Sequence, residues 1–337
     1  MVDLSTDYLG LKLANPLVPS ASPLSKDLDT AKQLEDAGAS ALVMHSLFEE
    51  RIESESKRHD RFFHQQAIGH AEADSFHPMH FDYDSHQERY LTKLQQLKMQ
   101  LDIPIVASLN GTTAEGWVEY GSAMQQAGAD ALELNVYYIA ADIELSGESV
   151  EDQYLKILTE LRRHVSIPIT MKLSSQFSSP LHFINRLKQA GASGVALFNR
   201  FYQPDIDLET LLITPKMHPS TSAETLMRIR WVALLYGRVN LSIAVTGGFH
   251  TVEDIIKALL AGADVTHLCN VLLEKGPQQL KQLLDELSDW LLQREYNSVQ
   301  QLKGSLSQQH AINPTEYERA NYIDVLDSYS SSNGVLR

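Results

Sequence analysis

The 337-residue sequence contains one cysteine, few basic residues and no long apolar run. Because Cys269 stands alone, one chain can form neither a disulfide framework nor a four-thiolate zinc or iron–sulfur site. No apolar run approaches the roughly 18 residues of a membrane span, and the N-terminus lacks the basic-then-apolar pattern of a signal peptide. The sequence therefore predicts a cytoplasmic protein without a membrane partner.

The balance of charge is acidic. The chain has 28 Lys and Arg residues against 43 Asp and Glu residues, which gives a net charge of −15 at pH 7. Nucleic acids and anionic membranes require a basic face, so no nucleic-acid partner is expected. A small anion bound in a locally positive pocket stays compatible with this composition.

A tetrapeptide with a central glycine recurs four times, twice as Ala-Gly-Ala-Asp and twice as Ala-Gly-Ala-Ser. Each copy follows an amphipathic segment, where a glycine predicts the end of a helix because it adopts left-handed backbone angles without steric cost. A short apolar run suited to a buried parallel strand follows each copy. The four glycines are Gly38, Gly128, Gly191 and Gly262.

Another apolar run precedes each of these helices, so the chain reads strand-helix-strand four times. Eight parallel strands joined by helical crossovers close most naturally into an α/β fold of the (β/α)8 or TIM barrel type. An open, doubly wound sheet is the alternative, and the even spacing favours the barrel. In chain order, the expected strands are NPLVPSAS, ALVMHS, IPIVASLNG, ALELNV, IPITMKLSS, GVALFN, LSIAVTGGF and VTHLCN.

We expect one barrel domain over residues 1–310 and a polar C-terminal tail over 311–337. The N-terminal residues predict a hairpin that turns at Gly10 and covers the barrel floor. Two insertions, 49–100 and 203–222, are expected at the barrel mouth, the first as a lid over the site. A capping box at residues 221–224 predicts the start of the sixth helix.

The first insertion is rich in histidine, which raises the alternative of a metal site through His77 and His80. A third ligand at a defined spacing is missing from this segment. No metal site is therefore expected.

Lys172 is the most informative residue at the C-terminal ends of the strands, where such barrels carry their chemistry. Its neighbours Met171 and Leu173 need the helix-facing side of the strand, so Lys172 should point into the barrel mouth. It could form a Schiff base, or it could stay charged and stabilise negative charge on a bound ring. The alternative is a structural ion pair with Glu133.

Gly247 and Gly248 predict a phosphate site, because paired glycines let backbone N–H groups approach an anion. Their place after the seventh strand supports this interpretation, since phosphate sites in these barrels commonly use the loops after strands seven and eight. The next helix should begin near Thr251, with Asp254 completing its cap.

Three asparagines, Asn110, Asn135 and Asn199, fall at strand ends. One such residue alone is as easily a loop cap. Three converging amides beside a lysine indicate recognition of a planar, hydrogen-bonding ring such as a flavin or a pyrimidine.

Together these motifs resemble the FMN-dependent dihydroorotate dehydrogenase family, the soluble class 1 type in particular. The resemblance runs from LANPLVPSAS to LLEKGP and includes AVTGGFHTVEDIIKALLAGAD. It implies an FMN across the barrel mouth, oxidation of a CH–CH bond and a homodimer. Because the chain starts directly at the hairpin and shows no second nucleotide-binding domain, we expect a soluble electron acceptor or a redox partner protein.

The resemblance also implies roles for single residues, with Lys172 stabilising the reduced flavin ring. The cofactor-binding residues would be Ala21, Ser22, Ser46, Asn110, Asn135, Lys172, Gly247, Gly248, Cys269 and Asn270. The substrate-binding residues would be His45, Asn135, Asn199 and Arg200.

Two stretches depart from the pattern of the family. Where class 1 enzymes continue Asn-x-Ser-Cys-Pro-Asn, or use serine as the base, this chain has Asn135-Val136-Tyr137-Tyr138-Ile139-Ala140. Tyr138 takes the place of the proton-abstracting residue and is the expected catalytic partner of Lys172, with Tyr137 as the alternative. The Lys-Ser pair on the second strand is here His45-Ser46. The expected substrate is dihydroorotate or a related dihydropyrimidine.

Three other functions fit parts of the sequence. A Schiff-base aldolase would use Lys172 without a flavin. A reductase of the tRNA-dihydrouridine type would need a basic surface, which the net charge opposes. The altered fourth strand would also suit a flavin-binding barrel with lost or altered turnover that acts as a redox partner subunit.

Overall fold

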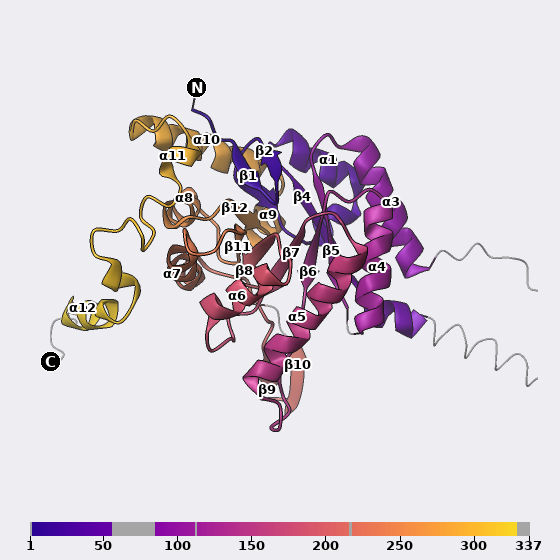
Figure 1. The fold of residues 1–337 in the computed structure, drawn as a ribbon. Helices are drawn as coiled ribbons and strands as arrows, with labels where there is room; N and C mark the ends of the chain where they lie inside the picture. Colours follow the sequence, from indigo (N-terminus) through magenta and orange to yellow (C-terminus); the bar gives the residue numbers. More distant parts are fainter. Residues whose placement is uncertain (1, 56–84, 112, 216–217, 329–337) are drawn as a thin grey trace, which may run out of the picture.

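The computed structural model describes residues 2–55, 85–111, 113–215 and 218–328. His77, His80 and the central part of the first expected insertion lie outside these ranges, so the metal alternative and the lid stay predictions. An eight-stranded sheet dominates the described chain (Figure 1). Its strands are β3 (Leu17–Pro19), β4 (Leu42–Phe48), β5 (Ile105–Asn110), β6 (Ala131–Asn135), β7 (Ile169–Leu173), β8 (Gly194–Leu197), β11 (Ser242–Thr246) and β12 (Val265–Leu268).

The sheet is parallel throughout and runs in the order β3-β12-β11-β8-β7-β6-β5-β4. Its two end strands meet through Ser40, whose backbone N–H and side-chain hydroxyl both donate to the Leu17 carbonyl, at 3.3 and 3.0 Å. The strands are almost wholly buried, because helices cover them outside and side chains fill them inside. The (β/α)8 barrel expected from the sequence is confirmed.

Helices follow the strands around the outside of the barrel (Figure 1). Each turns an apolar stripe towards the strands, as α5 does with Tyr154, Leu158 and Leu161. The four repeated glycines adopt φ of 98–121° just after their helices, which confirms the expected helix ends. The helices around the barrel are α1 (Leu28–Asp36), α3 (His86–Gln100), α4 (Ala114–Gln126), α5 (Gly147–His164), α6 (Pro180–Gln189), α7 (Thr225–Leu235), α8 (Val252–Ala261) and α10 (Gln278–Gln293).

Helix α3 occupies the last part of the first expected insertion, 49–100. It begins with a capping box at Ser85 and Glu88 and buries Tyr90, Leu94 and Leu97 against the barrel. This stretch is therefore a regular crossover helix, which its sparse apolar periodicity concealed in the sequence. Among the described residues, no helix combines the length and the apolar character that a membrane crossing requires.

The N-terminal hairpin, β1 (Thr6–Tyr8) and β2 (Leu11–Leu13), closes the bottom of the barrel. Tyr8 and Leu9 are buried there, and the Leu9 N–H donates to the hydroxyl of Ser242, the first residue of β11, at 2.8 Å. The turn at Gly10 has φ of +76°. The hairpin thus seals the floor, and ligands must enter from the other end.

The second expected insertion, 203–222, forms a hairpin of β9 (Pro204–Asp207) and β10 (Leu212–Pro215). It projects from the end of the molecule opposite β1 and β2 (Figure 1). The capping box of Thr221 and Glu224 is present, at a short 3-10 turn, η2 (Ser222–Glu224), that leads into α7. The remaining short elements are η1 (Pro23–Lys26), α9 (Asn270–Lys275), α11 (Val299–Leu302), η3 (Pro314–Tyr317) and α12 (Ala320–Ser328).

Candidate active site

A cavity of about 560 Å³ opens at the C-terminal ends of the barrel strands. Apart from Tyr138, every side chain or loop that the sequence singles out for cofactor or substrate contributes to its wall. These residues are Ala21, Ser22, His45, Ser46, Asn110, Asn135, Lys172, Asn199, Arg200, Gly247, Gly248, Cys269 and Asn270. The volume is in the range of natural small-molecule sites.

Lys172 reaches the cavity from β7, and it is also ion-paired. Its Nζ lies 3.4 Å from Oε1 of Glu133 on β6, and the Glu133 side chain is completely buried. The expected ion pair with Glu133 is therefore present, and Lys172 also lines the cavity, so its role toward a bound ring stays a prediction. A carboxylate at this distance stabilises the ammonium, whereas Schiff-base chemistry needs the neutral amine.

His267 lies on the far side of Glu133, deeper in the barrel. Its Nδ1 is 3.7 Å from Glu133 Oε2, and neither side chain is exposed. Burial lowers the pKa of His267 to about 4, although Glu133 favours the charged ring. The imidazole is thus neutral at pH 7, and Lys172 carries the positive charge that balances Glu133.

Two of the expected ring-binding amides touch each other. The Asn199 Nδ2 group donates to Asn135 Oδ1 at 2.6 Å, which links the ends of β6 and β8 across β7. Asn110 is buried at the end of β5, and the Ser46 and Ser108 hydroxyls lie 2.8 Å apart on neighbouring strands. The wall from β4 to β8 therefore presents amides and hydroxyls around the ammonium of Lys172.

His45 replaces a lysine of the family pattern and is held by Ser25. The Ser25 hydroxyl accepts from the His45 backbone N–H at 2.7 Å and lies 3.2 Å from its Nδ1. Burial, followed by the positive charge of Lys26, lowers the pKa of His45 to about 4. The position therefore offers a neutral hydrogen-bonding ring at pH 7 where the family has a cation.

The loop after β11 has the shape of an anion cradle. Gly247 and Gly248 have φ of +87° and +92°. A Cβ atom on Gly247 would lie 2.7 Å from Arg228 Nη2, and one on Gly248 would lie 2.7 Å from the Thr221 carbonyl oxygen. Glycine is the residue that fits both positions, and both line the cavity, so backbone without side chains borders it here, as a phosphate site requires.

The N-terminus of α8, by contrast, is already capped. The Asp254 carboxylate accepts from the backbone N–H groups of His250 and Thr251, each at 3.1 Å, and Thr251 completes the box. The expected cap is therefore present, and it fills the helix end. An anion at this edge of the cavity would contact the glycine loop and the Cys269–Asn270 segment instead.

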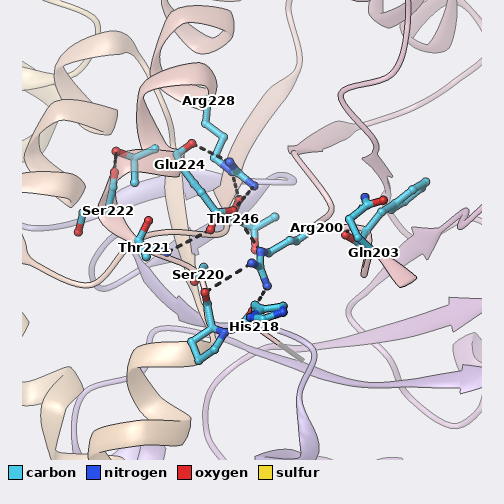
Figure 2. A network of polar contacts seen from close by, with 12 residues as sticks. Arg200, Gln203, His218, Ser220, Thr221, Ser222, Glu224, Arg228 and Thr246 are labelled. Atoms are coloured by element: carbon cyan, nitrogen blue, oxygen red, sulfur yellow. Dashed lines mark hydrogen bonds and ion pairs between the residues drawn. The ribbon is translucent and has the colours of Figure 1, made fainter. Parts of the chain in front are cut away.

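Arg200 belongs to a polar network at the same edge (Figure 2). Its Nε lies 3.1 Å from Glu224 Oε2, and its other nitrogens donate to the carbonyl groups of His218 and Pro219. Glu224 also lies close to Arg228, at 3.9 Å from Nη2. Arg200 thus holds the end of the second insertion over the cavity, a contact that the sequence did not indicate.

Sequence reasoning also missed part of the cavity wall. Lys26 and Arg51 line it, as do His86, His218 and Ser220. Among the described residues, four lysine and arginine side chains line the cavity, those of Lys26, Arg51, Lys172 and Arg200, against one acidic side chain, that of Glu50. The cavity is thus locally positive in a protein of net charge −15. The side chains that were missed do not lie at the ends of the expected strands, so the sequence pattern did not single them out.

The loop after β6 carries the two tyrosines. Tyr137 lines the cavity and stacks on Phe201, with ring centroids 4.0 Å apart, and its hydroxyl lies 3.5 Å from the Tyr202 carbonyl. Tyr138 is not among the residues of the cavity wall, and 36% of it is exposed. Of the two tyrosines, Tyr137 is therefore the one at the cavity, and it is the residue that the sequence offered as the alternative for proton transfer.

Comparisons with known proteins agree with this geometry. A family model described as dihydroorotate dehydrogenase matches residues 3–291. The chain is 23% identical over 317 residues to the dihydroorotate dehydrogenase B (NAD(+)) catalytic subunit of Thermoplasma acidophilum, covering 90% of this chain and 99% of that protein. It is 24% identical over 325 residues to the NAD-dependent dihydropyrimidine dehydrogenase subunit PreA of Escherichia coli K12, covering 90% and 76% of the two chains.

A shorter match joins the chain to the dihydroorotate dehydrogenase B catalytic subunit of Geobacillus kaustophilus, with 29% identity over 171 residues, or 49% of this chain and 54% of the other. The family model spans the hairpin, all eight barrel strands and the residues of the cavity. The expected resemblance is confirmed. The chain belongs to the dihydroorotate dehydrogenase family of oxidoreductases, whose members typically bind FMN.

Proposed function

We propose that this chain is an FMN-dependent oxidoreductase that acts on the CH–CH bond of a dihydropyrimidine-like ring. Dihydroorotate is one candidate substrate, and a dihydropyrimidine without a carboxylate is the other, because relatives of both names match over nine tenths of this chain. The observation that carries the proposal is the cavity itself, which combines a glycine cradle for a phosphate with a buried ammonium among amides.

The residues fit FMN group by group. Gly247, Gly248 and the Cys269–Asn270 backbone would hold the phosphate, and the other predicted cofactor residues, Ala21, Ser22, Ser46, Asn110, Asn135 and Lys172, would surround the ring. When bound, FMN supplies the acceptor for a hydride from the substrate carbon. Lys172, which is ion-paired with Glu133, would stabilise the negative charge that develops on the ring.

A proton must leave the substrate together with the hydride, and the tyrosine loop is the place to look for its acceptor. Tyr137 lines the cavity and is our first candidate, and Tyr138, the residue expected from the family pattern, is the second. Both would act as general acid–base groups at the substrate carbon. His45, Asn199 and Arg200 would orient the substrate ring, with His45 as a neutral hydrogen-bonding partner.

A redox partner subunit would receive the electrons. The names of the relatives describe a catalytic subunit and a subunit of larger enzymes, which supports this part of the proposal. The predicted homodimer has a candidate surface on the β9–β10 hairpin. Apolar side chains there are 62–82% exposed, namely those of Ile206, Leu208, Leu211, Leu212 and Ile213.

One observation favours a second candidate function, a flavin barrel without dehydrogenase turnover that passes electrons as a partner subunit. The family's cysteine or serine base is absent, and Tyr138 in its place does not line the cavity. Such a protein would still bind FMN but would not reduce it with a dihydropyrimidine. The aldolase alternative loses support, because the Lys172 amine is ion-paired with Glu133, whereas a Schiff base needs a free amine.

Anaerobic bleaching of the purified protein tests the proposal. Dihydroorotate and dihydrouracil are added separately to the FMN-loaded chain, and the loss of flavin absorbance is followed in a single turnover. Bleaching by one of them identifies an active dehydrogenase and its substrate class. Full retention of colour with both, in a protein that dithionite still bleaches, supports the partner-subunit alternative and contradicts the proposed activity.

A further inference from the structure

Arg228 is a buried cation behind the glycine loop. It lies on α7, is only 3% exposed, and ties the helix to the end of β11 (Figure 2). Its Nε donates to the Thr246 carbonyl at 2.5 Å, and its Nη1 donates to the Glu224 carbonyl at 2.6 Å. Thr246 is the last residue before Gly247, so the guanidinium fixes the peptide from which the loop departs.

The third nitrogen of this guanidinium lies beside the loop. A Cβ atom on Gly247 would approach Arg228 Nη2 to 2.7 Å and Nε to 3.2 Å, so the side chain fills the space behind that glycine. Thr246, Gly247 and Gly248 all line the cavity. The positive charge is therefore one peptide away from the proposed phosphate site.

The charge of Arg228 is incompletely balanced. Among the ion pairs of the described residues, the carboxylate nearest to it is that of Glu224, at 3.9 Å, and Glu224 forms a closer pair with Arg200 at 3.1 Å. Two guanidinium groups thus share one ion-paired carboxylate. Asp254, on the following helix, is used by the α8 cap and by the Ser222 hydroxyl.

A buried, under-compensated cation is unfavourable on its own. Burial is the main cause that lowers the pKa of Arg228, and Arg200 adds to it, while Glu224 opposes them. Removing a charge from water is unfavourable unless an opposite charge offsets the loss. An anion bound in the cradle would supply that opposite charge.

We propose that Arg228 is a positioning residue for the FMN phosphate, which fixes the Thr246–Gly248 loop and places a positive charge behind Gly247. This inference rests on the proposed function, since it assumes that the cradle takes a phosphate. The effect should be specific for the phosphate, because Arg228 faces the loop and not the ring-binding wall. Glu224 then tunes the site by sharing its charge between Arg228 and Arg200.

The experiment compares FMN with riboflavin, which has the same ring and no phosphate. Dissociation constants of both flavins are measured by fluorescence quenching on flavin-free protein. The proteins compared are the unaltered chain, Arg228→Met, Arg228→Lys and the control Arg230→Met. Arg230 lies on the exposed face of the same helix and contacts Asn321, far from the loop in sequence.

For Arg228→Met we expect FMN affinity to fall about 10- to 100-fold, as for loss of a charge-assisted contact, and riboflavin affinity to change less than about threefold. Arg228→Lys should keep most of the preference for FMN, and Arg230→Met should keep all of it. Equal weakening of both flavins by Arg228→Met would overturn the inference, because it would show that Arg228 is merely a tie between α7 and β11.

A second variant keeps the test decisive if Arg228→Met does not fold. Glu224→Gln removes the shared carboxylate and raises the net positive charge, so the preference for FMN over riboflavin should rise about two- to fivefold at low salt. A purely structural network predicts no rise, and that result would contradict the inference. If the unaltered chain binds neither flavin, the proposed function fails, and this inference fails with it.

Discussion

Two loops at the barrel mouth differ in how firmly they are held. The loop after β11, residues 247–251, is fixed by Arg228 at the strand end before it, by the Thr221 carbonyl beside Gly248 and by the Asp254 cap behind it. The loop after β6, residues 136–146, has no regular structure, and its Tyr137, Tyr138, Ile139 and Ile143 are 36–96% exposed. Both loops border the same cavity, but only the first one is over-determined by buried polar contacts.

The two loops would serve different parts of the proposed function, because the first would bind the cofactor and the second would contact the substrate. The firmly held loop keeps the glycines that a phosphate requires, and a site of this kind tolerates little change. The exposed loop carries the departure from the family's catalytic motif, and exposed loops are where function changes most readily. We therefore infer that cofactor binding follows the family and that substrate choice is the variable part of this protein.

A side chain added to the rigid loop should have the largest effect on cofactor binding. Gly248→Val places a β-branched residue at φ of +92° and a Cβ atom 2.7 Å from a carbonyl oxygen. We expect FMN affinity to fall about 1,000-fold, which corresponds to roughly 4 kcal/mol. The control is Gly276→Val, at φ of +82° with nothing within 4 Å of the added Cβ, which should leave FMN affinity unchanged. An equal loss in both variants would show general strain only.

Substitution of Lys172, in the cavity wall between the two loops, tests its role in flavin reduction. Lys172→Met should slow single-turnover flavin reduction by about 100-fold, because it removes the charge that stabilises the reduced ring. It should also destabilise the fold by about 3–5 kcal/mol, since Glu133 is left buried without its cation. The double variant Glu133→Gln with Lys172→Met should regain stability but not rate. Recovery of both would mean that Lys172 has only a structural role.

Two variants of the exposed loop distinguish the roles of its tyrosines. Tyr137→Phe should slow flavin reduction about tenfold or more, since its ring lines the cavity, and Tyr138→Phe should change the rate less than about twofold. Stopped-flow absorbance at saturating substrate measures both rates. The opposite order would return the catalytic role to Tyr138, as the family pattern suggests, and two unchanged rates would make both tyrosines packing residues.

The smallest expected effect is on the pH dependence of stability, through His267 in the barrel below both loops. His267 is completely buried with its pKa lowered to about 4, so between pH 6.5 and pH 4 the unfolded chain binds a proton that the folded chain does not. Stability from this residue is therefore full above pH 6.5 and falls with falling pH, by about 2 kcal/mol at pH 5. Urea unfolding at pH 7 and pH 5 should show a smaller difference for His267→Leu than for the unaltered chain. An unchanged difference would mean that His267 titrates normally.

The barrel could be predicted because its signals are local and repeated. The glycines at positions 38, 128, 191 and 262 end helices through their own backbone angles, and the strand-end residues follow from a fixed period. Lys172 and the Gly247–Gly248 pair could be placed at the mouth by the same logic. The fold class and the family could thus be predicted from the sequence.

What could not be predicted depends on contacts between distant parts of the chain. Arg228 looks like an ordinary helix residue, and only its burial under Thr246 reveals its role. The different positions of Tyr137 and Tyr138 depend on stacking against Phe201, which lies 64 residues further along the chain. Helix α3 was hidden because most of its turns carry polar residues. These features come from tertiary packing, which short-range patterns do not encode.

The central claim is that the barrel mouth holds FMN, and a titration tests it most directly. Purified protein, freed of any bound flavin, is titrated with FMN while its visible spectrum and flavin fluorescence are recorded. We predict a yellow complex with one FMN per chain, quenched fluorescence, and loss of binding in Gly248→Val. Protein that is colourless as isolated, and that neither quenches nor retains added FMN, would contradict the account.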